Sequence, residues 1–228
     1  AALAYDAQEQ LIDLIDSPLV GWKVGATGPA SQTKLGVKTP IYGPVFQRTL
    51  IESGHDVPLS DFHHQPGLES EFAFTIGVTL RPGGAAMNAR SAKEIVSTVH
   101  TAIELVCSRF DRNFDVDPAL LVADGALHAA LMVGPGKDPA EVRDLSTHRL
   151  RTVVNNQEIA TGTGQEVLGD PYESLAWLCN HLNRRQLTLA AGSIVTTGAA
   201  TGLHTTEVGQ ILTTDGGTLG SASLNLVA

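Results

Sequence analysis

The amino-acid sequence predicts a single domain of the α+β class, mainly β, covering residues 1–228. Helix-like spacing of apolar residues is confined to three segments, and the second half of the chain is rich in β-branched residues between glycine turns. These segments occur in blocks, without the regular alternation of a βαβ fold. With 43% hydrophobic and 17% charged residues, the chain can bury one sizeable core.

Two of the predicted helices lie in the first half of the chain. An N-terminal helix within residues 1–18 stops before Pro18, and because its pattern is already under way at the first residue, we expect a further piece upstream. A second helix is predicted over residues 91–106, where Ser91 and Glu94 have capping-box spacing. The apolar stripe of this second helix consists of Ile95, Val96, Val99, Ala102, Ile103 and Val106.

The third predicted helix begins at Asp170, a typical N-cap residue, with proline at the first helical position. Its buried face is expected to contain Leu175, Leu178 and Leu182. Strands are predicted where β-branched or alternating residues lie between turns. They cover residues 19–26, 67–74, 151–163, 192–199, 205–215 and 218–227.

Composition and charge exclude several classes of function. The net charge is −9 and the 15 basic residues are scattered, so no basic patch is available for nucleic acid or an anionic membrane. No segment approaches the ~20 consecutive apolar residues of a membrane span, and the N-terminus lacks a basic region followed by an apolar one. Cys107 and Cys179 have apolar neighbours and no CxxC partner, which predicts buried free thiols. We therefore expect a cytoplasmic protein.

Two glutamates, Glu69 and Glu71, stand one residue apart in the apolar stretch GLESEFAF. In a strand they project from one face, where their charges repel each other. A divalent metal would supply the missing positive charge, and carboxylate ligands suit Mg²⁺ or Mn²⁺. Glu104, in the apolar segment AIELVCSRF, is the candidate third ligand. Spacing alone leaves open a second interpretation, in which all three are solvated surface residues.

Six blocks of sequence, in order along the chain, resemble one known group of proteins. They are VGWKVGATGPASQTKLGVKTPIYGPVF, QPGLESEFAF, AIELVCSRF, ATGTGQEVLGDP, LAWLCNHL and IVTTGAATG. Together they resemble the 2-keto-4-pentenoate hydratase and 4-oxalocrotonate decarboxylase group of the fumarylacetoacetate hydrolase superfamily, from about Tyr5 to about Leu226.

This resemblance implies a mixed-β roll of the fumarylacetoacetate hydrolase C-terminal type, with a few flanking helices. It implies that Glu69, Glu71 and Glu104 hold Mg²⁺ or Mn²⁺, with Glu71 also counted among the catalytic residues. The substrate would be a 2-oxo acid or its enol, chelating the metal through its carboxylate and 2-oxygen. Proteins with this roll form dimers or larger rings, so we expect a homo-oligomer.

The resemblance also assigns roles to residues outside the carboxylate cluster. Lys23 in GWKVGAT matches a strand lysine that stabilises charge on the substrate or supplies a proton. Thr197 and Gly198 match a strand end where a hydroxyl and a backbone N–H meet the substrate carboxylate. Asp124 is expected to help proton transfer or orientation.

The chain departs from the hydratase pattern at several positions. Hydratases of the group read ADNAS where this chain reads ADGALH, so that Asp124 is kept while Gly125 and Leu127 replace polar residues. His128 either takes the place of a lost polar group or simply packs. Gln47 stands where the group often has an acidic residue, and an amide cannot act as a general base.

Other features bear on the choice among branches of the superfamily. The stretch SRFDRNFDVDPALLVADG is more similar to the decarboxylase branch. The hydrolase branch relies on a histidine and a glutamate in a mobile lid, for which His63 and His64 are the only nearby histidines, more typically surface residues.

Three hypotheses therefore remain. The first is a Mg²⁺- or Mn²⁺-dependent hydratase that adds water to a 2-hydroxy-2,4-dienoate in aromatic-compound degradation. The second is a decarboxylase or tautomerase of a 4-oxalocrotonate-like 2-oxo acid, which needs no positioned water. The third is a catalytically impaired relative that binds a 2-oxo acid without turnover.

Overall fold

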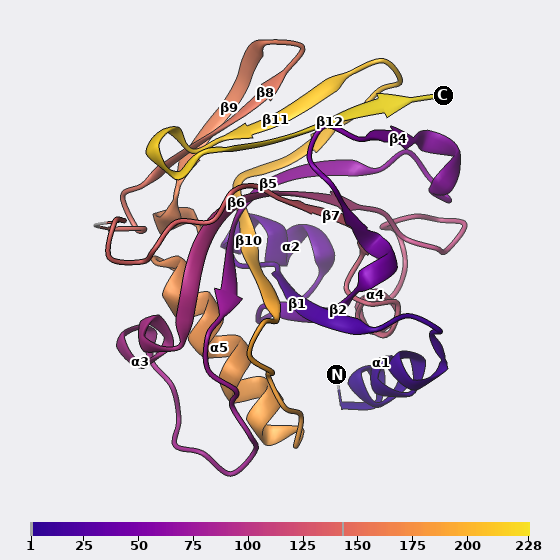
Figure 1. Cartoon of the computed structure of the whole chain (residues 1–228). Coiled ribbons are helices and arrows are strands. Elements are labelled where there is room, and N and C mark those ends of the chain that lie inside the picture. Colours follow the sequence, from indigo (N-terminus) through magenta and orange to yellow (C-terminus); the bar gives the residue numbers. More distant parts are fainter. Residues whose placement is uncertain (1, 143) are drawn as a thin grey trace.

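The computed structural model describes residues 2–142 and 144–228 and shows a curled, mainly β fold, with α1, α3 and α5 outside the curl of the strands (Figure 1). This confirms the predicted α+β, mainly β class. In the described part of the chain the strands form a sheet of seven and a sheet of five.

The seven-stranded sheet carries the candidate site. Its strand order is β2-β1-β10-β5-β6-β7-β3, with parallel pairing for β1 with β10 and β3 with β7, and antiparallel pairing elsewhere. The bounds are β1 Leu19–Gly25, β2 Ile41–Phe46, β3 Leu50–Ile51, β5 Gly67–Ile76, β6 Val96–Val106, β7 His128–Val133 and β10 Ile194–Thr205.

The five-stranded sheet lies against the outer face of β5 and β6 (Figure 1). Its order is β4-β12-β11-β8-β9. Apolar side chains such as Leu68, Ile103 and Leu224 fill the space between the sheets. A buried chain of hydroxyls runs through the same layer, where Ser70 Oγ lies 2.8 Å from Thr152 Oγ1. The bounds are β4 Asp56–Pro58, β8 Arg149–Val154, β9 Gln157–Thr163, β11 Ile211–Asp215 and β12 Ser221–Val227.

The helices are short apart from the first and the last. They are α1 Ala2–Leu14, α2 Pro29–Leu35, α3 Ala89–Glu94, α4 Pro118–Ala123 and α5 Pro171–Arg184. The N-terminal helix is present as predicted, with residue 1 outside the described residues. The helix at Asp170 is also confirmed, because its carboxylate caps the Tyr172 N–H at 2.9 Å. No described helix has the length and apolar character needed to cross a membrane.

The prediction of a helix over residues 91–106 is wrong. Only Ala89–Glu94 is helical, with Asn88 rather than Ser91 as its N-cap, and Val96–Val106 is strand β6. This strand lies inside a sheet, and its second half, residues 101–106, is buried on both faces. Its apolar residues therefore do not alternate strictly with polar ones, and their spacing matches a helical stripe by chance. Glu104 therefore lies on a strand and not in the predicted helix.

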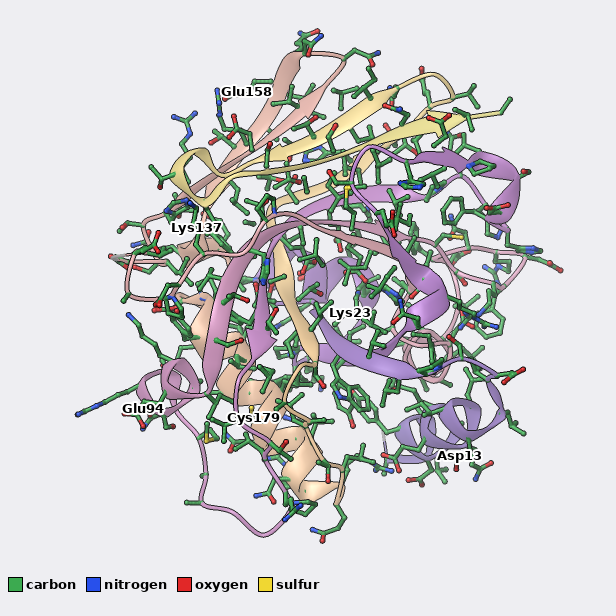
Figure 2. All side chains as sticks on the ribbon, viewed as in Figure 1. Asp13, Lys23, Glu94, Lys137, Glu158 and Cys179 are labelled. Atoms are coloured by element: carbon green, nitrogen blue, oxygen red, sulfur yellow. The ribbon has the colours of Figure 1, made fainter. Side chains whose placement is uncertain are left out.

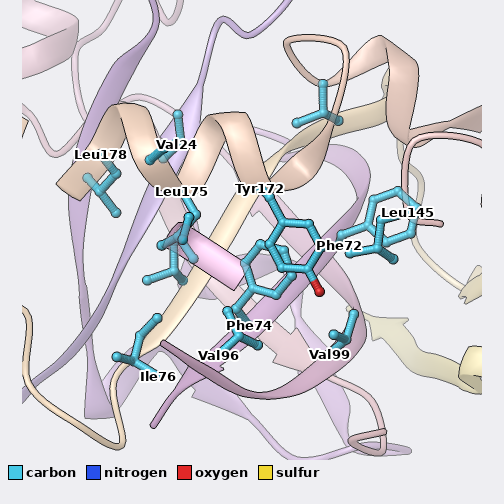
Figure 3. Close-up of a cluster of buried hydrophobic side chains, with 14 of the residues drawn as sticks. Val24, Phe72, Phe74, Ile76, Val96, Val99, Leu145, Tyr172, Leu175 and Leu178 are labelled. Atoms are coloured by element: carbon cyan, nitrogen blue, oxygen red, sulfur yellow. The ribbon is translucent and has the colours of Figure 1, made fainter. Parts of the chain in front are cut away.

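The main core lies between the convex side of the sheet and α5 (Figure 3). Phe74 of β5 stacks on Tyr172 of α5, with ring centroids 4.9 Å apart. Leu175 and Leu178 extend the contact along the helix, as expected from the sequence. Because this packing holds β5 and β6 from outside, the side chains on their other face are directed into the curl.

Candidate metal centre and its cavity

The three predicted carboxylates meet on neighbouring strands. Glu69 and Glu71 project from one face of β5, and Glu69 pairs directly with Glu104 of β6 in the antiparallel ladder. One carboxylate oxygen from each residue lies within 4.8 Å of the other two. Glu71 and Glu104 are fully buried, whereas Glu69 is partly exposed. The proximity predicted from the ExE spacing and Glu104 is thus present.

Among the residues that the structure describes, two oxygens of this cluster have no hydrogen-bond partner. Glu71 Oε2 accepts the Gly198 N–H at 2.8 Å, and Glu71 Oε1 accepts none. Glu104 Oε1 lies 2.8 Å from His128 Nδ1, and Glu104 Oε2 accepts no hydrogen bond. A buried carboxylate oxygen without a partner is costly in free energy. A hard divalent cation coordinated by these two oxygens and Glu69 would remove that cost, so the residues present fit such an ion.

Lys23 of β1 completes the charged group. Its side chain is 3% exposed, and Nζ lies 3.3 Å from Glu104 Oε2 and donates to the Ala126 carbonyl at 2.9 Å. In Figure 2, Lys23 lies inside the curled strands, whereas Glu94, Lys137 and Glu158 lie at the periphery. The three glutamates bring three formal negative charges and Lys23 only one positive charge, which leaves a deficit that a divalent ion would offset.

Burial, together with this charge imbalance, shifts the pKa values of all four side chains of the cluster. Burial is the main cause that raises the pKa of Glu69 to about 7, with Lys23 opposing it and Glu104 adding to it. Burial also raises the pKa of Glu71, with Glu104 and Glu69 adding to it. Burial acts in the same direction on Glu104, but Lys23 and the His128 hydrogen bond outweigh it and lower its pKa. Burial alone would lower the pKa of Lys23, but the three carboxylates together raise it.

A cavity of about 380 Å³ opens onto this group. Glu69 and Lys23 form part of its wall, and α2 borders it with Lys34 and Leu35. The other lining residues include Thr27, Phe114, Leu127, Glu166 and Leu203. From the sequence, Leu127 is identified only as a departure from the hydratase pattern, and no individual role is predicted for the other lining residues. They come from separate loops and strands that no local motif links.

Thr197 and Gly198 lie within β10, at an irregularity in its pairing with β5, rather than at a strand end. The Thr197 hydroxyl donates to the Phe72 carbonyl at 3.1 Å, and the Gly198 N–H donates to Glu71. Their polar groups therefore support β5 and a candidate ligand. The substrate contact expected of them stays a prediction.

Four other residues singled out in the sequence, Asp124, Gln47, His63 and His64, are not among the described residues that line the cavity. Asp124, at the end of α4, accepts from Arg109 Nε at 2.6 Å. Gln47 is exposed in the short turn after β2. His63 faces Asp111 and His64 the Phe110 carbonyl, on a separate surface loop. The role in proton transfer or orientation expected of Asp124 remains a prediction.

Comparison with known proteins places this geometry in a family. Residues 25–223 match the family described as Fumarylacetoacetate (FAA) hydrolase C-terminal. The chain belongs to the fumarylacetoacetate hydrolase family. The superfamily resemblance and the mixed-β roll predicted from the sequence are thereby confirmed.

Relatives within the fumarylacetoacetate hydrolase family carry two different activities. The chain is 32% identical over 204 residues to a 2-keto-4-pentenoate hydratase of Burkholderia vietnamiensis, covering 87% of this chain and 76% of the relative. It is also 32% identical over 204 residues to a 4-oxalocrotonate decarboxylase of Pseudomonas sp., covering 87% and 75%. These relatives are enzymes, and the chain is equally similar to the hydratase and to the decarboxylase.

A solved structure from the fumarylacetoacetate hydrolase family superposes closely. It is 4-oxalocrotonate decarboxylase from Pseudomonas putida G7 complexed with magnesium and adipate, with a TM-score of 0.89 and 28% identity, covering 98% of this chain and 86% of that one. The same enzyme complexed with calcium and acetate also has a TM-score of 0.89. Divalent ions thus occur in neighbours of this fold.

Proposed function

We propose that this protein is a divalent-metal-dependent lyase that adds water to a 2-hydroxy-2,4-dienoate of the 2-keto-4-pentenoate type. The observation that carries the proposal is a pair of buried carboxylate oxygens, Glu71 Oε1 and Glu104 Oε2, that have no hydrogen bond among the described residues. Glu104 Oε2 is paired in charge with Lys23, and Lys23 and Glu69 line the cavity. The ion is Mg²⁺ or Mn²⁺, because the ligands are all carboxylates and both are hard cations that bind oxygen. Family membership and the named relatives support the same class of reaction.

The residues of the chain suggest how the reaction is assisted. When bound, the ion would supply Lewis-acid stabilisation of the negative charge that develops on the 2-oxygen of the substrate. Lys23 Nζ, positively charged and shielded from water, would stabilise the same charge or donate a proton. Apolar side chains at the cavity, including Leu35, Phe114 and Leu203, would contact the substrate tail.

Decarboxylation of a 4-oxalocrotonate-like acid is the second candidate. One observation favours it: Lys34 of α2 lines the cavity, and its ammonium could meet the second carboxylate of such a substrate. An uncharged tail would not need this contact. The Pseudomonas putida decarboxylase with adipate, a dicarboxylate, supports this alternative.

Titration calorimetry with Mn²⁺, alone and with oxalate as a mimic of the chelating enolate, tests the metal-dependent proposal. We expect oxalate to strengthen Mn²⁺ binding, and Glu71→Gln to abolish it. Glu166→Gln is the matched control, because Glu166 also lines the cavity but lies outside the carboxylate cluster. Absence of Mn²⁺ binding to the wild-type protein would contradict the proposal.

Product analysis separates the two candidate reactions. The wild-type protein with Mg²⁺ is incubated with 2-hydroxypenta-2,4-dienoate and, separately, with 4-oxalocrotonate. Hydration of the first without carbon dioxide from the second supports the hydratase. Carbon dioxide release that falls in Lys34→Met, together with no hydration, would favour the decarboxylase instead.

A further inference from the structure

We propose that the turn Gly125–His128 positions the centre, with His128 orienting the Glu104 carboxylate and the Ala126 carbonyl anchoring Lys23. The inference rests on the proposed metal-dependent function, and it assigns a role to a turn that departs from the hydratase pattern. His128 is in this view a positioning residue, which acts through Glu104 and does not contact the substrate.

The backbone of this turn has an unusual conformation. Gly125, Ala126 and Leu127 are consecutive residues with positive φ, at 80°, 55° and 69°. Residues other than glycine rarely adopt this conformation, and it persists only where the surrounding structure holds it. Here β2 lies close against the turn, because a Cβ added at Gly43 would lie 2.0 Å from the Gly125 carbonyl oxygen. The strain is thus maintained by packing next to the candidate centre.

The turn delivers two polar groups to the same ion pair. The Ala126 carbonyl accepts from Lys23 Nζ at 2.9 Å, and His128 Nδ1 lies 2.8 Å from Glu104 Oε1. Lys23 and Glu104 are themselves 3.3 Å apart. One short segment therefore contacts both the cation and the anion of the pair.

His128 is held at both ring nitrogens. Its Nε2 lies 2.9 Å from Thr49 Oγ1, and the Thr49 hydroxyl, which has a single proton to donate, also lies 2.8 Å from the Phe46 carbonyl. The His128 side chain is 3% exposed, so no water competes freely for these contacts. With both nitrogens bonded, the ring cannot rotate without losing a partner. The Glu104 carboxylate is consequently fixed in one orientation.

This orientation decides which oxygen Glu104 can present. Oε1 is used by His128, and Oε2 is left without a hydrogen bond, next to Lys23. Removing a residue that hydrogen-bonds to a metal-ligating side chain commonly lowers metal affinity by about 10- to 100-fold. A histidine that only filled space would affect the stability of the fold but not the affinity for the ion.

Calorimetric titration of Mn²⁺ into the full chain and four variants tests the inference. His128→Leu removes both hydrogen bonds, and His128→Asn keeps a donor close to the position of Nδ1. Thr49→Val removes only the outer contact. His100→Leu is the matched control, because His100 is also a partly buried, hydrogen-bonded histidine on the sheet but lies outside the carboxylate cluster. The melting temperature of every variant is measured without metal.

We expect His128→Leu to raise the Kd for Mn²⁺ by about 10- to 100-fold, His128→Asn to recover most of the affinity, and Thr49→Val to give a smaller loss. His100→Leu is expected to lower the melting temperature without changing the Kd. An unchanged Kd in His128→Leu would overturn this inference but not the proposed function. If His128→Leu does not fold, an unchanged Kd in Thr49→Val would have the same consequence. No Mn²⁺ binding by the wild-type protein would overturn the proposed function as well.

Discussion

Glu69 of β5 lies directly opposite Glu104 of β6 as a pair of the antiparallel ladder. Like charges in this arrangement destabilise a sheet, and here they lie beside a third carboxylate, Glu71, which is fully buried. Lys23 compensates for only part of this charge. The arrangement makes the metal-free fold dependent on protonation and on cations, from which the following predictions derive.

Replacement of Glu71 by glutamine is expected to separate metal affinity from stability. The amide keeps an oxygen that can accept the Gly198 N–H, but it removes a carboxyl group whose ionisation is unfavourable in the buried cluster, as its raised pKa shows. We expect the metal-free variant to unfold at a higher denaturant concentration than the wild-type protein, and Mn²⁺ to give it no further stabilisation. Chemical denaturation with and without Mn²⁺ measures both effects. A less stable metal-free variant would show that the charge repulsion is already relieved in the wild-type protein.

The stability of the metal-free protein is expected to fall as the pH rises from about 4.5 to 7. Burial raises the pKa of Glu69 from its ordinary value of 4.5 to about 7, so in this window the folded protein holds a proton that the unfolded chain has released. The contribution of protonated Glu69 to stability is complete below about pH 4.5 and is lost as the pH rises past about 7. Glu71 acts in the same direction because its pKa is also raised.

Melting temperatures across this pH range, with and without Mg²⁺, test this dependence. Burial lowers the pKa of His100 and His181, which acts with the opposite sign in part of the same window. The profile is therefore compared with that of Glu69→Gln, which should be less steep. Saturating Mg²⁺ should flatten the wild-type profile, since the ion takes the place of the proton. Identical slopes in the two proteins would contradict the assignment to this cluster.

Replacement of Lys23 by methionine is expected to destabilise the metal-free protein by about 3 to 5 kcal/mol, because Glu104 then keeps a buried charge without its partner. Mg²⁺ should restore part of this loss by supplying positive charge, while turnover remains low. Lys34→Met serves as the control, since Lys34 is an exposed lysine on the same cavity. Denaturation curves and turnover are measured for both variants; equal stability losses in the two would argue against the buried ion pair.

Replacement of Gly198 by alanine should cost far more than the same change at Gly209. Both glycines have positive φ, but a Cβ at Gly198 would lie 2.3 Å from Thr27 Oγ1, whereas none of the described atoms lies within 4 Å of one at Gly209. Gly209→Ala should therefore cost only the backbone strain, about 1 kcal/mol. Gly198→Ala should in addition weaken Mn²⁺ binding, because the Gly198 N–H holds Glu71. Equal stability losses with unchanged Mn²⁺ binding would contradict this account.

The mainly β class, the helix that begins at Asp170 and the cluster of three carboxylates could all be predicted from the amino-acid sequence. These features depend on local rules: β-branched segments between glycine turns, a capping residue before proline, and the two-residue period that places Glu69 and Glu71 on one face. That residues 96–106 form a strand is evident only in the folded chain, since burial on both faces of a sheet removes the alternation by which a strand is recognised. The same is true of the contacts of Glu104 with Lys23 and His128, because they join separate segments of the chain that meet only when the sheet curls.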